Sequence, residues 1–312
     1  MLVQALLPLG VLVVLAPPAA PAIGGGSGPW ECVEGRCVGG AEVAASQLLQ
    51  PVPLHQASQA ACRLHCGQHG ALWPRPTGPT TIGRQVVSID PGRVRIQLSV
   101  PPPARARASG PGPPLGVAAR AVLQEASRGL DAALRRLCDA GCVAGDHGLA
   151  VVINATGADL GLDWDTDESY RLDVSSKGGT VRATVHAATV WGARHGVQTL
   201  GQLVTAIAMP ATSAGSPPRV MLVAVAAARV ADAPRYPHRG VLLDTARHYL
   251  PLSALLRTVD AMAASKLNVL HWHATDSHSF PLLLPGAPQL ARTGAYSPRE
   301  VYSPAAVASV LR

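Results

Sequence analysis

The sequence contains few charged and few aromatic side chains. Charged residues make up 14% and aromatic residues 4% of its 312 positions, and phenylalanine occurs once. Lys177 and Lys266 are the only lysines, so the formal net charge of +7 comes almost wholly from arginines. The arginines are scattered along the chain, without a basic block or a basic helix. A nucleic-acid-binding function therefore has little support.

An internal hydrophobic run long enough to cross a bilayer is also missing. A transmembrane helix needs about 20 apolar residues, whereas the stretch 220–230 is interrupted by Arg229 and has the length of a strand. At the amino terminus, an apolar run from Ala5 to Leu15 precedes Ala20-Pro21-Ala22, which fits a signal-peptidase site. We predict a signal peptide over 1–22, with a membrane anchor as the alternative, and no stable membrane span.

The cysteines fit a chain that passes through the secretory pathway. They form three close pairs, which are Cys32 and Cys37, Cys62 and Cys66, and Cys138 and Cys142. An even number of cysteines in a secreted chain indicates disulfides, whereas zinc knuckles usually use tighter C-x2-C pairs. We expect the first two pairs to cross-link each other and the third to close locally. Asn154 begins a glycosylation sequon, with an unused sequon as the alternative.

Periodicity divides the remaining sequence into three parts. Residues 23–71 form a Cys-rich segment, and 72–232 mix strands, hairpins and helices as in a small α+β domain. The first elements expected in that domain are strands at 86–89 and 94–98 around the turn Asp90-Pro91-Gly92, and a helix at 117–138. A strand at 149–153 and half-buried strands at 169–174 and 181–186, around the hairpin turn Lys177-Gly178-Gly179, are expected next, followed by a helix at 190–204 and a strand at 219–226. An exposed Pro/Gly/Arg-rich loop is expected at 101–114.

After a linker at 233–237, the third part, 237–312, has the pattern of βα repetition. The continuous apolar run 240–243 is typical of a strand buried on both faces. A helical stripe from Leu252 to Met262 follows, then a second apolar strand at 267–271 and a further element near Pro304. This order predicts the beginning of a (β/α)8 barrel, in which functional side chains follow the strands.

Polar residues follow both predicted strands. Asp244 to Tyr249 come after the first, and HWHATDSHSF, 271–280, comes at the second. Because neighbouring βα loops face each other across a barrel mouth, Arg247 and Asp276 could converge on one ligand, and the planar fork of arginine suits vicinal sugar oxygens. Three alternatives stay open: an Asp244–Arg247 pair that only fixes a loop, His271 and His273 as buried supporting groups, and a metal site at the H-x-H pair.

The segment PHRGVLLDTARHYLPLSALLRTVDAMAASKLNVLHWHATDSHSFPL, from 237 onward, resembles the start of the catalytic barrel of the β-N-acetylhexosaminidases, glycoside hydrolase family 20. LWPRPTG at 72–78, DESYRLDV at 167–174 and TVWGARHGVQTLGQLV at 189–204 resemble the amino-terminal domain of that family. The Cys-rich segment, HWHATDSHSFP and GAYSPREVYS are most similar to the arthropod chitin-degrading type.

The resemblance implies an α+β domain followed by the first βα units of a truncated TIM barrel. It implies exo-hydrolysis of terminal N-acetylglucosamine or N-acetylgalactosamine from β-linked oligosaccharides, glycoconjugates or chitin fragments. The mechanism is substrate-assisted and retaining: the acetamido oxygen of the substrate, held beside the anomeric carbon, is the nucleophile. No metal or cofactor is expected. The expected location is extracellular or lysosomal, and a homodimer is expected for a full-length form.

The resemblance also assigns site residues. Arg247 matches the arginine that binds sugar hydroxyls, Asp276 matches the aspartate beneath the pocket, and His273 is a supporting residue. The adjacent catalytic Asp-Glu pair of the family has no counterpart, because the only Asp-Glu, Asp167-Glu168, matches a segment of the amino-terminal domain. Since a barrel takes about 250 residues, we expect an amino-terminal piece that is inactive alone. The alternative is a secreted, non-catalytic form that binds sugar weakly.

Overall fold

The computed structural model of the chain describes residues 3–6, 29–39, 52–100, 115–138, 141–158, 160–209 and 219–311. The predicted signal-peptidase site and the loop predicted at 101–114 lie outside these ranges. The chain divides into two compact units, of which the smaller contains Leu162–Thr166 and Tyr236–Arg312 and the larger contains Asp167–Arg235. Among the described helices, none is long and apolar enough to cross a membrane.

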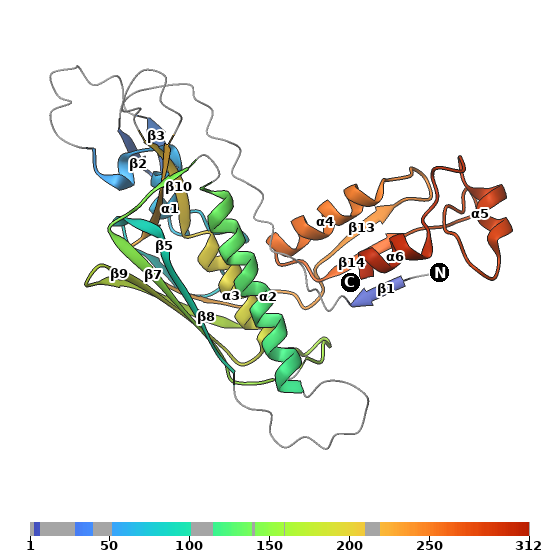
Figure 1. Ribbon diagram of the computed structural model, residues 1–312, viewed down its shortest axis with the longest axis horizontal. Helices are drawn as coiled ribbons and strands as arrows, with labels where there is room; N and C mark the ends of the chain where they lie inside the picture. Colours follow the sequence, from blue (N-terminus) through green and yellow to red (C-terminus); the bar gives the residue numbers. More distant parts are fainter. Residues whose placement is uncertain are drawn as a thin grey trace. The chain divides into compact units, whose positions relative to one another are not determined.

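The larger unit is built on a nine-stranded mixed sheet. Its strand order is β10-β11-β5-β7-β9-β8-β12-β4, with β6 beside β11. These strands are β4 (Thr80–Ile82), β5 (Val86–Ser99), β6 (Cys142–Val143), β7 (His147–Ala155), β8 (Tyr170–Lys177), β9 (Thr180–Ala187), β10 (Val204–Met209), β11 (Arg219–Val225) and β12 (Ala227–Asp232). The helices α2 (Leu115–Arg136) and α3 (Val190–Gly201) lie on one face of the sheet (Figure 1).

The alternation of side chains along the strands explains why one face is covered. Along β8, buried positions such as Leu172 and Val174 alternate with exposed ones, as predicted for a half-buried strand. Gly178 and Gly179 join β8 to β9 with φ values of 57° and 69°, which favour glycine and fit a two-residue hairpin. Thr189 then caps α3 by accepting a hydrogen bond from the Gly192 amide at 3.1 Å. The predicted hairpin and helix are therefore confirmed.

Two sequence predictions in this unit are wrong. Asp90-Pro91-Gly92 does not turn the chain, because 86–99 form the single strand β5 with an irregularity between Ile89 and Val94. The first half of β5 pairs antiparallel with β11 and the second half pairs parallel with β7. A bulge therefore occupies the place of the predicted turn. Val204 does not extend the helix at 190–204, since it begins the unpredicted strand β10.

The Cys-rich segment is cross-linked in the favoured pattern. Disulfides join Cys32 to Cys66 and Cys37 to Cys62, and Cys138 to Cys142 closes a local loop. The first two connect the hairpin of β2 (Trp30–Val33) and β3 (Arg36–Gly39) to α1 (Gln59–His65), through Cys62 inside the helix and Cys66 directly after it. A 3-10 turn at Leu54–Gln56 precedes α1. The predicted pairing is therefore confirmed.

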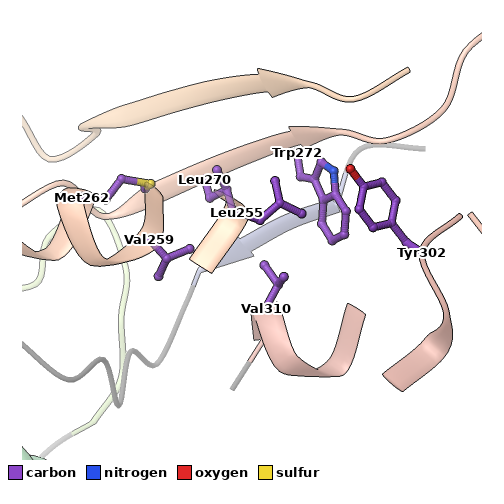
Figure 2. Packing of buried hydrophobic residues seen from close by; sticks show 7 residues of the cluster. All are labelled: Leu255, Val259, Met262, Leu270, Trp272, Tyr302 and Val310. Carbon is purple, nitrogen blue, oxygen red and sulfur yellow. The ribbon is translucent and has the colours of Figure 1, made fainter. Parts of the chain in front are cut away.

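The smaller unit contains the predicted βα repetition. β13 (Gly240–Asp244) pairs parallel with β14 (Val269–His273), and α4 (Leu252–Ala264) connects them. β1 (Val3–Leu6) pairs antiparallel with the other edge of β14, and α5 (Pro288–Gly294) and α6 (Pro304–Leu311) follow. Figure 2 shows the core between α4, β14 and α6, which consists of Leu255, Val259, Met262, Leu270, Trp272, Tyr302 and Val310.

The strands of the smaller unit differ from the prediction in two respects. β13 is not buried on both faces, because the Leu242 side chain is 56% exposed and β14 is the only described strand paired with β13. β14 begins and ends two residues later than predicted, so His273 lies in the strand. This shift brings His273 level with Asp244 in the parallel register.

Candidate functional site

The candidate site lies where β13 and β14 end. Asp244 and His273 are register partners in the parallel pair, and the Thr245 amide donates to the His273 carbonyl at 2.9 Å. The loops that follow the two strands therefore leave the sheet side by side. Arg247 comes from the first loop and Asp276 from the second. This arrangement follows from the parallel pairing that the apolar strands predicted.

An ion pair joins the two predicted sugar-binding residues. The Arg247 Nε donates to Asp276 Oδ2 at 2.9 Å. The Arg247 side chain is 54% exposed, and no described residue is bonded to its terminal amino groups. Hydrogen bonding to Asp276 raises the pKa of Arg247 above the usual value for arginine. The guanidinium is thus anchored through one nitrogen and can offer the others to a ligand.

Asp276 accepts hydrogen bonds from four groups. Its Oδ1 accepts from the His278 and Ser279 amides at 2.7 and 3.2 Å, and its Oδ2 also faces His273 Nε2 at 3.4 Å. The His278 amide is the largest cause, and Arg247 a further one, of an Asp276 pKa well below its usual range. The Asp276 carboxylate therefore remains a fixed negative charge and is poorly suited to act as a general acid.

Asp244 pairs with the Arg247 backbone and not with its guanidinium. The Asp244 carboxylate accepts the backbone amides of Ala246 and Arg247 at 3.1 and 3.0 Å, while the Arg247 guanidinium turns to Asp276. Asp244 thus folds the loop that carries Arg247. His271 and His273 share one strand face, with ring centroids 6.4 Å apart, and both are half-buried rather than buried.

Three further residues hold the Arg247 loop, and the sequence analysis missed them. The Trp272 Nε1 donates to Thr245 Oγ1 at 2.8 Å, and the Ser279 hydroxyl donates to the Ala246 carbonyl at 2.5 Å. The Tyr302 hydroxyl donates to the Leu250 carbonyl at 2.6 Å and accepts from the Leu250 amide at 3.2 Å. The sequence offered a signal only at Trp272, which directly follows the strand predicted at 267–271, because a buried aromatic donor needs a partner.

The three groups Asp244, His273 and Asp276 are also close enough to be considered as cation ligands. One donor atom from each lies within 4.8 Å of the others. Both Asp276 oxygens and one Asp244 oxygen, however, already accept hydrogen bonds. His271, the other half of the H-x-H pair, is outside this cluster. The bonding therefore favours a site for a neutral polar ligand over a metal site.

The remaining predicted residues lie in the larger unit. Asn154 is half-buried near the end of β7, with its Nδ2 3.3 Å from His186 Nδ1, and glycosylation at Asn154 stays a prediction. Glu168 contacts His195 Nε2 at 2.9 Å, and Asp167 Oδ1 accepts the Ser169 amide at 2.8 Å. The only Asp-Glu pair of the sequence is thus part of the larger unit.

Comparison with known proteins identifies both units. The model of the glycosyl hydrolase family 20 catalytic domain matches residues 236–312, and a "beta-acetyl hexosaminidase like" model matches 146–203. A chitooligosaccharidolytic beta-N-acetylglucosaminidase of Ostrinia furnacalis is 33% identical over 97% of this chain, which spans 46% of that relative. The Bombyx mori protein of the same name is 35% identical over 79% of this chain, and this chain spans 38% of that relative.

A solved structure has the same fold. The chitobiase of Flavobacterium johnsoniae superimposes with a TM-score of 0.51 at 23% identity, over 77% of this chain and 32% of its own. The present chain spans less than half of the length of each relative named here. Because the insect relatives are 33% and 35% identical over most of this chain and both family models match it, the chain belongs to glycosyl hydrolase family 20.

Proposed function

We propose that these residues belong to a β-N-acetylhexosaminidase that releases terminal N-acetylglucosamine or N-acetylgalactosamine from β-linked glycans. Chitooligosaccharides are the favoured substrate class, because the two insect relatives carry that substrate in their names. In this proposal, residues 72–232 are the amino-terminal domain, after a Cys-rich segment at 23–71, and 237–312 begin the catalytic barrel. The three disulfides support passage through the secretory pathway, to the extracellular space or the lysosome.

The pairing of Arg247 with Asp276 carries the proposal. Terminal sugars expose vicinal hydroxyls, and a guanidinium presents a planar fork of donors to such oxygens. Asp276 fixes this fork through Nε at 2.9 Å, and the exposed side of Arg247 is left for the ligand. In this role Arg247 binds the sugar, whereas Asp276 positions Arg247 and keeps a negative charge beneath it. His273 supports Asp276 through its Nε2.

The chemistry of the family requires two further carboxyl groups. The acetamido oxygen of the substrate attacks the anomeric carbon while one aspartate orients the acetamide and a glutamate protonates the leaving oxygen. Asp167-Glu168 is unsuited to this work because Glu168 is held by His195. We therefore propose that the 312 residues bind the terminal sugar without turning it over. A secreted form that only binds sugar is the second candidate, and the same site would serve it.

A graft tests the hydrolase proposal. Residues 237–312 replace the matched segment of the Ostrinia furnacalis relative, and kcat/KM is measured with a chromogenic N-acetylglucosaminide. Arg247→Lys in this graft should lower kcat/KM at least about tenfold, because a charged hydrogen bond contributes about 1.5–3 kcal/mol. The control is Arg257→Lys, which changes an exposed arginine on α4. An active graft in which both variants keep full activity would refute the assignment of Arg247.

The 312-residue chain itself tests the sugar binding that both candidates require. We expect N-acetylglucosamine to perturb the NMR signals of the Arg247 loop, while the chromogenic substrate is left intact. Hydrolysis of the chromogenic substrate by this chain would contradict the proposal that the 312 residues bind the sugar without cleaving the glycosidic bond. Unchanged spectra at high sugar concentration would remove the sugar-binding candidate as well.

A further inference from the structure

The larger unit has a partly exposed sheet face whose side chains take no part in the candidate sugar site. Helices α2 and α3 lie on one face (Figure 1), and along β8, β9 and β12 the side chains of the other face are exposed or half-buried. Along β8, the residues Arg171, Asp173, Ser175 and Lys177 point to this face and are exposed. Arg182 on β9, Arg229 on β12 and Arg95 on β5 are exposed as well. Basic residues from four strands thus line one surface.

The strand register confirms that these side chains share the face. Arg182 is the cross-strand partner of Ser175 on one side and of Ala150 on the other, and Ala150 is in turn the partner of Arg95. Arg229 is the partner of Asp173. Cross-strand partners project to the same side of a sheet. We call Arg95, Arg171, Arg182, Arg229 and Lys177 the basic face.

The basic face has a large excess of positive charge. Among the cross-strand partners of the basic-face residues, Asp173 is the only acidic one, and it contacts Arg229 at 3.5 Å. Arg95 donates to the backbone carbonyls of Gly92 and Val94. The side chains of Arg171 and Arg182 form no hydrogen bond or ion pair with a described residue. Their guanidinium groups are therefore available to anionic groups of a ligand.

The spacing of these residues indicates an extended ligand. Arg182 and Arg95 lie two strands apart, which corresponds to about 10 Å between their backbones. The basic face runs from β5 to β12 in the sheet order, so a polymer with repeated anionic groups can contact more of its arginines at once than one small anion can. Tryptophan, tyrosine and phenylalanine are absent from the exposed positions of β5, β7, β8, β9 and β12 in this part of the sheet. Single-stranded nucleic acid, which needs aromatic stacking, is therefore a poorer fit.

We propose that the basic face binds a sulfated polysaccharide. Arginine pairs with sulfate oxygens in the same forked geometry that it uses for phosphate and carboxylate. The disulfides indicate an oxidising compartment, and sulfated polysaccharides occur outside the cell. The basic face would retain the protein on a polyanionic matrix, independently of sugar binding at Arg247. The proposal does not rest on the hydrolase function.

Binding of fluorescent heparin to the 312-residue chain tests this proposal. The double variant Arg171→Gln/Arg182→Gln should weaken binding by about tenfold at physiological ionic strength, which is about 1.4 kcal/mol. The control Arg120→Gln/Arg128→Gln removes the same charge from exposed positions of α2 and should leave binding within about twofold. Equal weakening by both pairs would overturn the proposal, because net charge alone would then explain binding.

Two further measurements do not depend on how the Gln variants fold. Heparin should protect Arg171 and Arg182 of the unaltered chain from an arginine-modifying reagent, and Arg120 and Arg128 should stay reactive. Desulfated heparin should neither bind nor protect. Equal binding of desulfated heparin, tighter binding of single-stranded RNA or anionic lipid vesicles, or no protection of Arg171 and Arg182 would each refute the proposal.

Discussion

Arg247 Nε and Asp276 Oδ2 lie 2.9 Å apart, although the two residues come from different loops. The parallel pairing of β13 and β14 brings the loops together, and Asp244 and Ser279 hold the backbone of Ala246 and Arg247. The Asp276 carboxylate therefore lies among hydrogen-bond donors whose positions are set by the fold. These donors favour the ionised form of Asp276, and a titration can measure that effect.

Asp276 should remain ionised in acid. Its pKa is lowered by the His278 amide and by Arg247. A lowered native pKa gives a stabilising contribution that is complete above the unfolded value, about 3.9 for aspartate. That contribution is lost only as the pH falls through the lower native pKa. A titration of the Asp276 carboxyl carbon by NMR should show a midpoint clearly below that of the same carbon in the urea-unfolded chain, and an equal midpoint would contradict the hydrogen bonding described here.

Tyr302 should hold the Arg247 loop through its hydroxyl. Burial raises the pKa of Tyr302, so the group stays protonated and donates to Leu250. Tyr302→Phe keeps the ring contacts with Trp272 and Tyr249 but removes two hydrogen bonds. We expect the smaller unit to lose about 1–3 kcal/mol, since one hydrogen bond contributes about 0.5–1.5 kcal/mol.

Hydrogen exchange provides the measurement for this variant. The Leu250 amide should exchange faster in Tyr302→Phe than in the unaltered chain. Tyr296→Phe is the matched control, because Tyr296 is 57% exposed. If the two variants exchange alike at Leu250, the Tyr302 hydroxyl has no part in holding the loop.

The sequence predicted the polar pair but not the residues that hold it. Arg247 and Asp276 follow apolar strands, and parallel strands end at the same edge of a sheet. Ser279 and Tyr302 reach the loop from irregular segments, where no period relates sequence distance to position in space. The basic face was also missed, because Arg95, Arg171, Arg182 and Arg229 are far apart in the sequence and meet only through strand order.

The two errors in the larger unit have a similar cause. Asp90-Pro91-Gly92 has the composition of a turn, yet the same residue types suit a bulge. Pairing of the two halves of β5 with β11 and β7 decides between them, and that pairing is a long-range property. Gly178-Gly179 was predicted correctly because two residues with positive φ between alternating strands leave few alternatives.

Gly196 should tolerate no side chain. A Cβ at this position would lie 2.5 Å from Val185 Cγ1 and 3.1 Å from Tyr170 Cδ2, between α3 and the sheet. Gly196→Ala should therefore lower the free energy of unfolding by about 1–3 kcal/mol, as overpacking of a filled core does. Gly286→Ala is the control, because its Cβ would meet nothing within 4 Å. Thermal unfolding should separate the variants, and equal melting temperatures would refute the close contact of α3 with β9.

The disulfides should differ in what they contribute to stability. Cys37–Cys62 closes a loop with a sequence separation of 25, whereas Cys138–Cys142 spans only 4. Taken for each bridge by itself, the loop-entropy relation gives about 3.5 kcal/mol for the longer loop and about 2 kcal/mol for the shorter one. The enclosing Cys32–Cys66 bridge remains in place and lowers the first of these two values. Replacing Cys37 and Cys62 together by serine should therefore destabilise the Cys-rich segment more than the same change at Cys138 and Cys142 destabilises its surroundings. Hydrogen exchange of α1 and of the end of α2 measures both effects locally. A larger loss of protection in the Cys138–Cys142 variant would show that the local bridge matters through packing rather than through loop closure.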